Sequence, residues 1–161
     1  MTDNKIQLKN ENILKLEICT EDGESTGDFL EFDLEDIELP FKYQEILDRL
    51  KKSREKIKNQ FVIIDKQQDH KGKKLLSSRE EAKLKALNEF YKEQEEIYNL
   101  FLGENGVKKL LHGRNMRWTT LNEIDEIIST QIAPKLDMTM DNITKKIKSK
   151  YSTKKEENIL E

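Results

Sequence analysis

The chain has 161 residues, of which 35% are hydrophobic and 38% are charged, and its formal net charge is −3. This length suits one domain with a modest core, and so high a charge content argues against an enzyme built around a deep apolar pocket. Cys19 is the single cysteine, which excludes an internal disulfide, and the sequence shows no leader and no apolar run of membrane-spanning length. We therefore expect a cytoplasmic protein without a membrane segment.

Charge is divided unevenly between the two ends of the chain. Up to Leu39 there are three lysines and twelve acidic residues, a net charge of −9, and the remainder carries +6. The lysines crowded near the C-terminus are Lys145, Lys146, Lys148, Lys150, Lys154 and Lys155. A basic end can contact phosphates, but Tyr151 is its only aromatic residue. We therefore favour the interpretation that these lysines form a solvated helical face over the interpretation that they bind nucleic acid.

The first 39 residues show the two-residue alternation of half-buried strands. The alternating apolar residues are Ile6 and Leu8, then Leu14, Leu16 and Ile18, then Leu30, Phe32 and Leu34. The stretch 21–28 has the glycine and acidic content of a hairpin loop. We predict a small antiparallel sheet in this region.

After Pro40 the apolar period becomes helical, and Pro40 suits a first helical turn because its missing N–H would be unpaired there anyway. The first stripe contains Tyr43, Ile46, Leu47, Leu50, Ile57, Phe61 and Ile64. The polar run 67–73 breaks the period and predicts a loop. Ser78 and Glu81 have capping-box spacing, which predicts that a second helix begins there.

The second helix carries a stripe of similar spacing. Its members are Leu84, Leu87, Tyr91, Gln94, Tyr98 and Phe101, and the stripe is widened by Phe90 and Ile97. This spacing lets one helix lie along another at a shallow angle, so we predict an antiparallel helical hairpin. Self-association as a coiled coil is the competing interpretation.

Residues 101–118 hold three of the six glycines and the only tryptophan. Glycine tolerates positive φ and commonly ends helices, so Gly103 and Gly113 are predicted to bracket a short turn. That turn carries Val107, Leu110 and Leu111.

The C-terminal third is predicted to be helical as well. Thr120 and Glu123 repeat the capping-box spacing, and Pro134 lies near the end of the apolar run that follows. That run contains Leu121, Ile124, Ile127, Ile128 and Ile132, and a last helix is indicated by Met138, Met140, Ile143, Ile147 and Tyr151.

The predicted fold class is α+β and predominantly α. It consists of a small N-terminal antiparallel sheet, a helical hairpin and a C-terminal group of shorter helices. The corresponding division is a β region at 1–39, a helical domain at 40–151 and a disordered tail at 152–161.

The sequence offers no catalytic, cofactor-binding or metal-binding constellation. His70 lies in a lysine-rich loop and His112 lies beside Gly113, without a second ligand at metal-binding spacing. Acidic runs such as 93–96 are typical of solvated helix surface rather than of acid/base pairs. The stretch 103–106 lacks the strand and the Gly-Lys-Ser/Thr ending of a phosphate-binding loop. We expect a protein that is not an enzyme and holds no cofactor.

Two groups of apolar residues are candidates for partner binding. On the second helix they are Phe90, Tyr91, Ile97, Tyr98 and Phe101, and around the glycine-rich turn they are Leu110, Leu111, Met116 and Trp118. Tryptophan is enriched at binding hot spots. The competing interpretation, which we favour, is that the first group is the core of the hairpin and that Trp118 fills a helix junction.

Five segments occur in an order that resembles the tail assembly chaperones of long-tailed phages and prophages of Gram-positive bacteria. They are Asp36-Ile-Glu-Leu-Pro40, Phe101-Leu-Gly-Glu-Asn-Gly106, Lys109-Leu-Leu-His-Gly-Arg114, Leu121-Asn-Glu-Ile124 and Ala133-Pro-Lys-Leu136. The resemblance covers about two thirds of the chain, and the order of the segments matches better than any single one.

The resemblance implies a non-enzymatic helper that binds the tape measure protein, keeps it soluble and recruits tail tube subunits. Such a protein acts in the host cytoplasm and is not expected in the mature virion. Self-association stays open. The alternatives are a structural tail or connector component retained in the virion and, less favoured, a small DNA-binding regulator.

Overall fold

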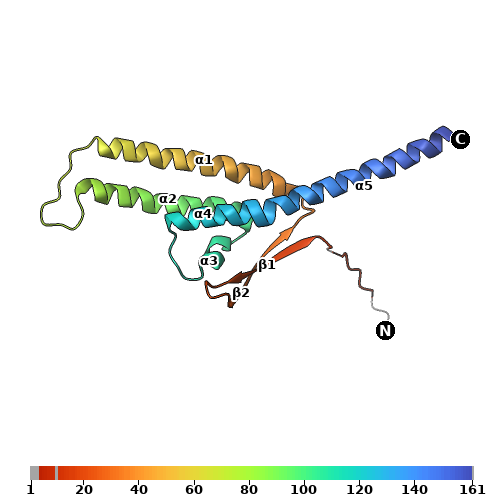
Figure 1. Cartoon of the computed structure of the whole chain (residues 1–161), viewed down its shortest axis with the longest axis horizontal. Helices are drawn as coiled ribbons and strands as arrows, with labels where there is room; N and C mark the ends of the chain where they lie inside the picture. Colours follow the sequence, from red (N-terminus) through yellow and green to blue (C-terminus); the bar gives the residue numbers. More distant parts are fainter. Residues whose placement is uncertain (1–3, 10, 161) are drawn as a thin grey trace. The chain divides into compact units, whose positions relative to one another are not determined.

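The computed structural model describes residues 4–9 and 11–160, and within the last helix it describes side chains as far as Tyr151. Two strands are followed by helices, which confirms the predicted α+β class with mostly helical content. Figure 1 shows the elements in chain order.

Contacts between residues divide the chain into two units. The first joins Met1–Leu16, Glu31–Ile37 and Trp118–Glu161, and the second joins Glu17–Leu30 and Glu38–Arg117.

The sheet has two strands, β1 (Ile13–Cys19) and β2 (Ser25–Asp33), which pair with each other as an antiparallel hairpin. The alternating residues Leu14, Ile18, Leu30 and Phe32 are all buried, which follows from the two-residue side-chain period of a strand. The turn is shorter than the predicted loop 21–28. It closes at Thr20, whose N–H donates to the carbonyl of Glu24 at 2.8 Å.

The predicted strand around Ile6 and Leu8 does not form. Residues 4–9 have no regular structure, and these two side chains are 94% and 91% exposed. Alternation over so few residues does not specify a strand unless a neighbouring strand pairs with it.

Helices α1 (Glu38–Asp65) and α2 (Ser78–Leu102) form the predicted antiparallel hairpin, which Figure 1 shows as two long neighbouring helices. Its two helices are joined by polar and aromatic contacts. Arg54 donates a hydrogen bond to the Tyr98 hydroxyl at 2.9 Å, and the rings of Tyr43 and Phe101 lie 5.7 Å apart. Buried residues recur along α1 from Leu39 to Ile64, so most of its stripe is covered, although Leu47 is 48% exposed.

Helix α2 begins one residue earlier than its predicted cap implies. The N-cap is Ser77, whose hydroxyl accepts from the N–H of Glu80 at 3.1 Å. Ser78 instead accepts from the backbone N–H of His70 at 2.9 Å, which closes the loop onto the helix start. Adjacent serines followed by adjacent glutamates present the capping-box spacing twice, which explains the one-residue error.

Gly103 and Gly113 follow helix ends, as predicted, but Val107, Leu110 and Leu111 between them lie in a short helix rather than in a turn. Gly103 ends α2 with φ 94°, and α3 (Gly106–Leu111) is followed by Gly113 with φ 83°. Gly106 is constrained by space rather than by φ, because a Cβ there would lie 2.7 Å from the Leu102 Cβ. The segment therefore needs glycine for two different reasons.

The C-terminal third is one continuous helical run rather than separate shorter helices. It comprises α4 (Trp118–Ile127), the π-helical turn η1 (Ile128–Ile132) and α5 (Ala133–Leu160). Thr120 lies inside α4 and is therefore not its cap. The Ala133 N–H donates to the Ile128 carbonyl, and this wider turn lets Pro134 stand in the first turn of α5, where no N–H is required.

The predicted division at residue 39 follows the change from strand to helix, and α1 begins at Glu38. The contact-based units do not follow it, because each strand contributes to both units. The predicted tail at 152–161 falls on residues whose side chains lie outside the described part, and it stays a prediction.

Candidate functional site

Four of the five candidate residues on α2 are buried. Phe90, Ile97, Tyr98 and Phe101 are at most 6% exposed, and Tyr91 is half-buried. Burial raises the pKa of the Tyr91 phenol above its ordinary value. These positions agree with the interpretation that the residues are core, and a partner reaches the buried four only if the packing around them opens.

The candidates around the glycine-rich turn are more accessible. Leu110 and Leu111 on α3 and Met116 beyond it are half-buried, whereas Trp118 at the start of α4 is 54% exposed. Such exposure does not fit a side chain that fills a helix junction. Trp118 thus stays a candidate contact residue.

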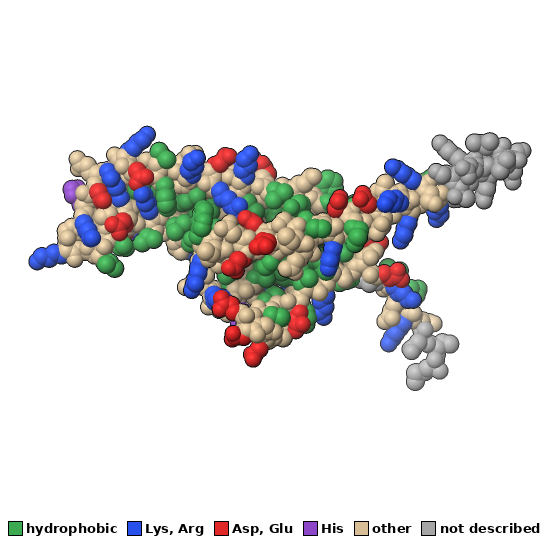
Figure 2. All heavy atoms as spheres, in the orientation of Figure 1, with side chains coloured by type: hydrophobic (Ala, Val, Ile, Leu, Met, Phe, Trp, Pro, Cys, Tyr) green, Lys and Arg blue, Asp and Glu red, His purple; other side chains and the backbone are tan. Residues whose placement is uncertain are grey.

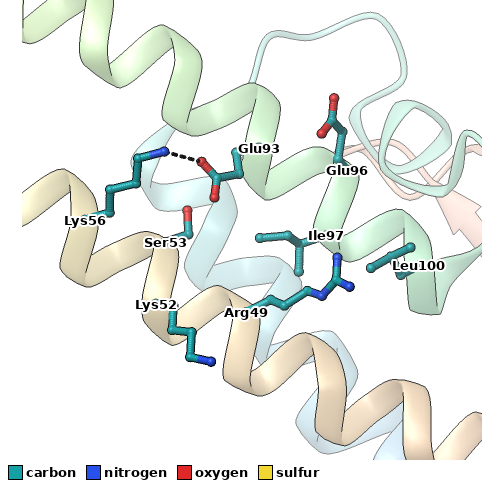
Figure 3. A pocket seen from close by; sticks show the side chains of 8 residues that line it. All are labelled: Arg49, Lys52, Ser53, Lys56, Glu93, Glu96, Ile97 and Leu100. Atoms are coloured by element: carbon teal, nitrogen blue, oxygen red, sulfur yellow. Dashed lines mark ion pairs between the residues drawn. The ribbon is translucent and has the colours of Figure 1, made fainter.

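The α1–α2 hairpin contains a groove that sequence reasoning did not identify. It has a volume of about 490 Å³, and each helix lines it at positions i, i+3, i+4 and i+7. We call this the hairpin groove. Its lining residues are Arg49, Lys52, Ser53 and Lys56 from α1 and Glu93, Glu96, Ile97 and Leu100 from α2 (Figure 3).

The two sides of the hairpin groove differ in charge. The α1 side presents three cations, while the α2 side presents two carboxylates. Across the groove, the Lys56 Nζ pairs with a Glu93 carboxylate oxygen at 3.6 Å. On α1, Arg49 and Lys52 also pair with Glu45 and Asp48 one turn earlier. All of these groups are well exposed, so each pair contributes at most about 1 kcal/mol.

Apolar and unpartnered polar groups lie between these charges. Figure 3 shows Ile97 and Leu100 on the α2 side, with the Arg49 side chain extending toward them from α1. Leu100 is 42% exposed, whereas Ser53 is 3% exposed and its hydroxyl has no hydrogen-bond partner. Ser53 also lines a second hollow of about 20 Å³, roughly the size of one water molecule.

Gln94 is a second buried polar residue in the hairpin. It is fully buried, and neither its amide nitrogen nor its amide oxygen has a hydrogen-bond partner. Buried polar groups are nearly always paired, so unpaired amide atoms on a mostly apolar stripe are unusual. Ser53 and Gln94 occupy stripe positions, and such polar interruptions are the sequence signal that could have directed attention to this part of the hairpin.

Figure 2 shows Lys/Arg and Asp/Glu side chains mixed over the hairpin, with apolar side chains among them. Within the described residues, no group of three or more His, Cys, Asp or Glu side chains is placed to hold a metal ion. None of the helices in that same part is both long and apolar enough to cross a membrane.

Comparisons with family models, with curated proteins and with solved structures find no match for this chain.

Proposed function

We propose that this chain is a tail assembly chaperone of a long-tailed phage or prophage. In this role it binds the tape measure protein in the host cytoplasm, keeps it soluble and helps recruit tail tube subunits. The chaperone is not an enzyme, and it leaves before the virion is complete.

The observation that carries the proposal is the order of the five segments of family resemblance. Four of them lie where helices begin or end, and the fifth lies inside α4. Segment 36–40 leads into α1, segment 101–106 spans the end of α2, segment 109–114 spans the end of α3, and segment 133–136 opens α5. Segments at helix ends determine where each amphipathic helix begins and ends. The proposed role depends on the apolar faces of those helices, which would contact the tape measure protein.

Exposed apolar side chains on the helical hairpin also support the proposal. Large apolar residues that are more than 40% exposed there are Phe41, Leu47, Val62, Ile63, Leu84 and Leu100. The tape measure protein is expected to be long, helical and rich in apolar stripes before the tube assembles around it. A carrier with accessible apolar side chains and a strongly charged surface can cover such stripes and remain dispersed.

Co-expression with the tape measure protein from the same phage or prophage tests the proposal. We expect this chain to co-purify with the tape measure protein and to raise its soluble fraction, compared with co-expression of an unrelated helical hairpin. An insoluble, uncaptured tape measure protein in the presence of this chain would contradict the proposal.

Two further measurements separate the alternatives. Mass spectrometry of purified particles should not detect this chain, whereas a structural tail or connector component would be present. For a DNA-binding regulator, the exposed residues Lys145, Lys146, Lys148 and Lys150 on α5 would be the contact residues. A gel shift that weakens steeply with salt would favour that role, because phosphate contacts release counterions.

A further inference from the structure

We propose that the hairpin groove binds one amphipathic helix of a partner protein, which packs as a third helix against α1 and α2. This inference rests on the proposed function for the identity of the partner, since the helix would then belong to the tape measure protein. The proposal depends on three properties of the groove: its helical spacing, its exposed apolar residue Leu100 and the different charges of its two sides.

The spacing of the lining residues fits a helix. Positions i, i+3, i+4 and i+7 on both α1 and α2 form a seam of two turns, about 10 Å long. Such a seam provides holes between four side chains, into which residues of a neighbouring helix insert as knobs. An extended peptide, with its two-residue period, does not match this pattern.

The floor of the groove indicates which side chains the partner helix presents. Leu100 offers apolar surface, and burying its exposed part would favour binding, whereas Ile97 is only 6% exposed. Ser53 also lines the groove, but it is 3% exposed and its hydroxyl is buried, so a partner does not reach it. A partner helix with an apolar residue over Leu100 would cover this exposed surface.

The sides of the groove indicate how the partner helix is oriented. Arg49, Lys52 and Lys56 line the α1 side, so the flank of the partner facing α1 should be acidic. Glu93 and Glu96 line the other side, so the opposite flank should be basic. The existing ion pairs are exposed and weak, and their members can exchange partners at little cost. Charge complementarity of this kind fixes register and orientation.

A second copy of the chain fits the groove less well than a single helix. Two hairpins related by a two-fold axis would match α1 cations with α2 carboxylates, which is electrostatically favourable. However, a hollow of about 490 Å³ would then face an identical hollow, and the space between them would stay unfilled. Close packing of interfaces favours a convex helix in the groove.

The decisive experiment replaces Leu100 by glutamate and measures binding of overlapping tape-measure fragments by biolayer interferometry. We expect Leu100→Glu to weaken the fragment that binds wild type best by about tenfold or more, because a charge replaces an apolar contact. Ile147→Glu is the matched control, since Ile147 is 51% exposed on a helix, α5, and does not line the groove. Both replacements introduce a good helix former.

A charge reversal provides a second variant should Leu100→Glu disturb the fold. Lys52 lines the groove and its side chain is 72% exposed, so Lys52→Glu should leave folding intact. We expect it to weaken fragment binding about threefold and to reduce the salt dependence, while Lys51→Glu, which is exposed outside the groove, changes neither.

Each result bears on the proposal. Loss of binding confined to the groove variants supports it. If groove and control variants bind like wild type, or weaken equally, the groove assignment is overturned while the proposed function stands. If wild type binds no fragment and no full-length tape measure protein, the proposed function fails, and the assignment fails with it. A dimer that Leu100→Glu converts to a monomer in sedimentation would assign the groove to a second copy instead.

Discussion

Helices α1 and α5 both carry apolar stripes, yet most of the stripe on α1 is covered, whereas the stripe on α5 becomes exposed toward Tyr151. Buried residues extend along α1 from Leu39 to Ile64. On α5, Leu136 is 4% exposed, whereas Ile147 and Tyr151 on the same stripe are 51% and 67% exposed. The helical period of apolar residues therefore identifies the apolar face of a helix, but it does not show whether another element packs against that face.

The difference has a physical origin in the order of the elements. Helix α2 follows α1 after one loop, so the two can form a hairpin whose closure costs little entropy. Such a hairpin covers its own stripes locally. The covered part also includes polar residues, Ser53 and Gln94, that an isolated exposed helix would tolerate at no cost.

The largest expected effect comes from removing the ring of Tyr98 from the hairpin. Tyr98 is fully buried and accepts a hydrogen bond from Arg54. We expect Tyr98→Ala to lower the free energy of unfolding by roughly 3–5 kcal/mol, as truncation of a buried aromatic residue does. Urea denaturation followed by circular dichroism measures this.

The same replacement on α5 is the matched control. Tyr151 is 67% exposed, so Tyr151→Ala should change the free energy of unfolding by no more than about 0.5 kcal/mol. Equal losses for the two variants would show that the stripe on α5 is covered in solution, and the contrast between the helices would then disappear.

A smaller effect is expected within α5 itself. Leu136→Ala should lower the free energy of unfolding by roughly 2–4 kcal/mol because Leu136 is buried. Ile147→Ala, at a half-exposed position three turns later, should cost well under half as much. Thermal unfolding of the two variants locates the point at which coverage of the stripe ends, and a larger loss for Ile147 would contradict the structure.

Much of this fold could be predicted because its signals are local. Periods of two and of about 3.6 residues correctly separated the sheet from the helices, and the glycine-rich segment was correctly predicted to end α2. The errors concern features that local sequence leaves ambiguous. Adjacent serines permitted two caps, and Pro134 indicated a break that a π-helical turn accommodates.

Prediction of the candidate site was less successful because burial depends on tertiary packing. Tyr98 and Trp118 were equally plausible as partner contacts by residue type, yet one is fully buried and the other is 54% exposed. The hairpin groove is lined by one row of mostly charged residues on α1 and by another row on α2. Neither row identifies a groove in the sequence, because charged residues at helical spacing usually indicate only a solvated face.

The unpaired amide of Gln94 gives a prediction of opposite sign. Gln94→Met keeps a similar shape and removes two buried groups that lack partners, so we expect the free energy of unfolding to rise by about 1–2 kcal/mol. Urea denaturation checks the sign. The neighbouring replacement Glu95→Met, which removes a half-buried charge, is the control and should have a small effect. A destabilised Gln94→Met would show that the amide is paired in solution.

The smallest expected effect lies where the hairpin loop meets the start of α2. Asp69 accepts hydrogen bonds from the Arg79 backbone N–H at 3.1 Å and the Ser78 hydroxyl at 3.3 Å. The hydrogen bond from the Arg79 N–H is the main reason why the pKa of the Asp69 carboxyl lies below its ordinary value of 3.8. The ionised form is thus the one that anchors the loop, beside the positive end of the helix dipole.

The direction of the pH dependence follows from the lowered pKa. Because the folded state holds the proton less tightly than the unfolded chain, this contact is fully present above pH 3.8 and is lost as pH falls through the lowered pKa. We expect Asp69→Ala to speed hydrogen exchange of the Arg79 amide at neutral pH without changing the exchange of Tyr98. Asp48→Ala, on the exposed face of α1, should leave the Arg79 amide unchanged. A measured Asp69 pKa at or above 3.8 would mean that the loop is not anchored by this carboxylate, and the hairpin would then depend on its helix packing alone.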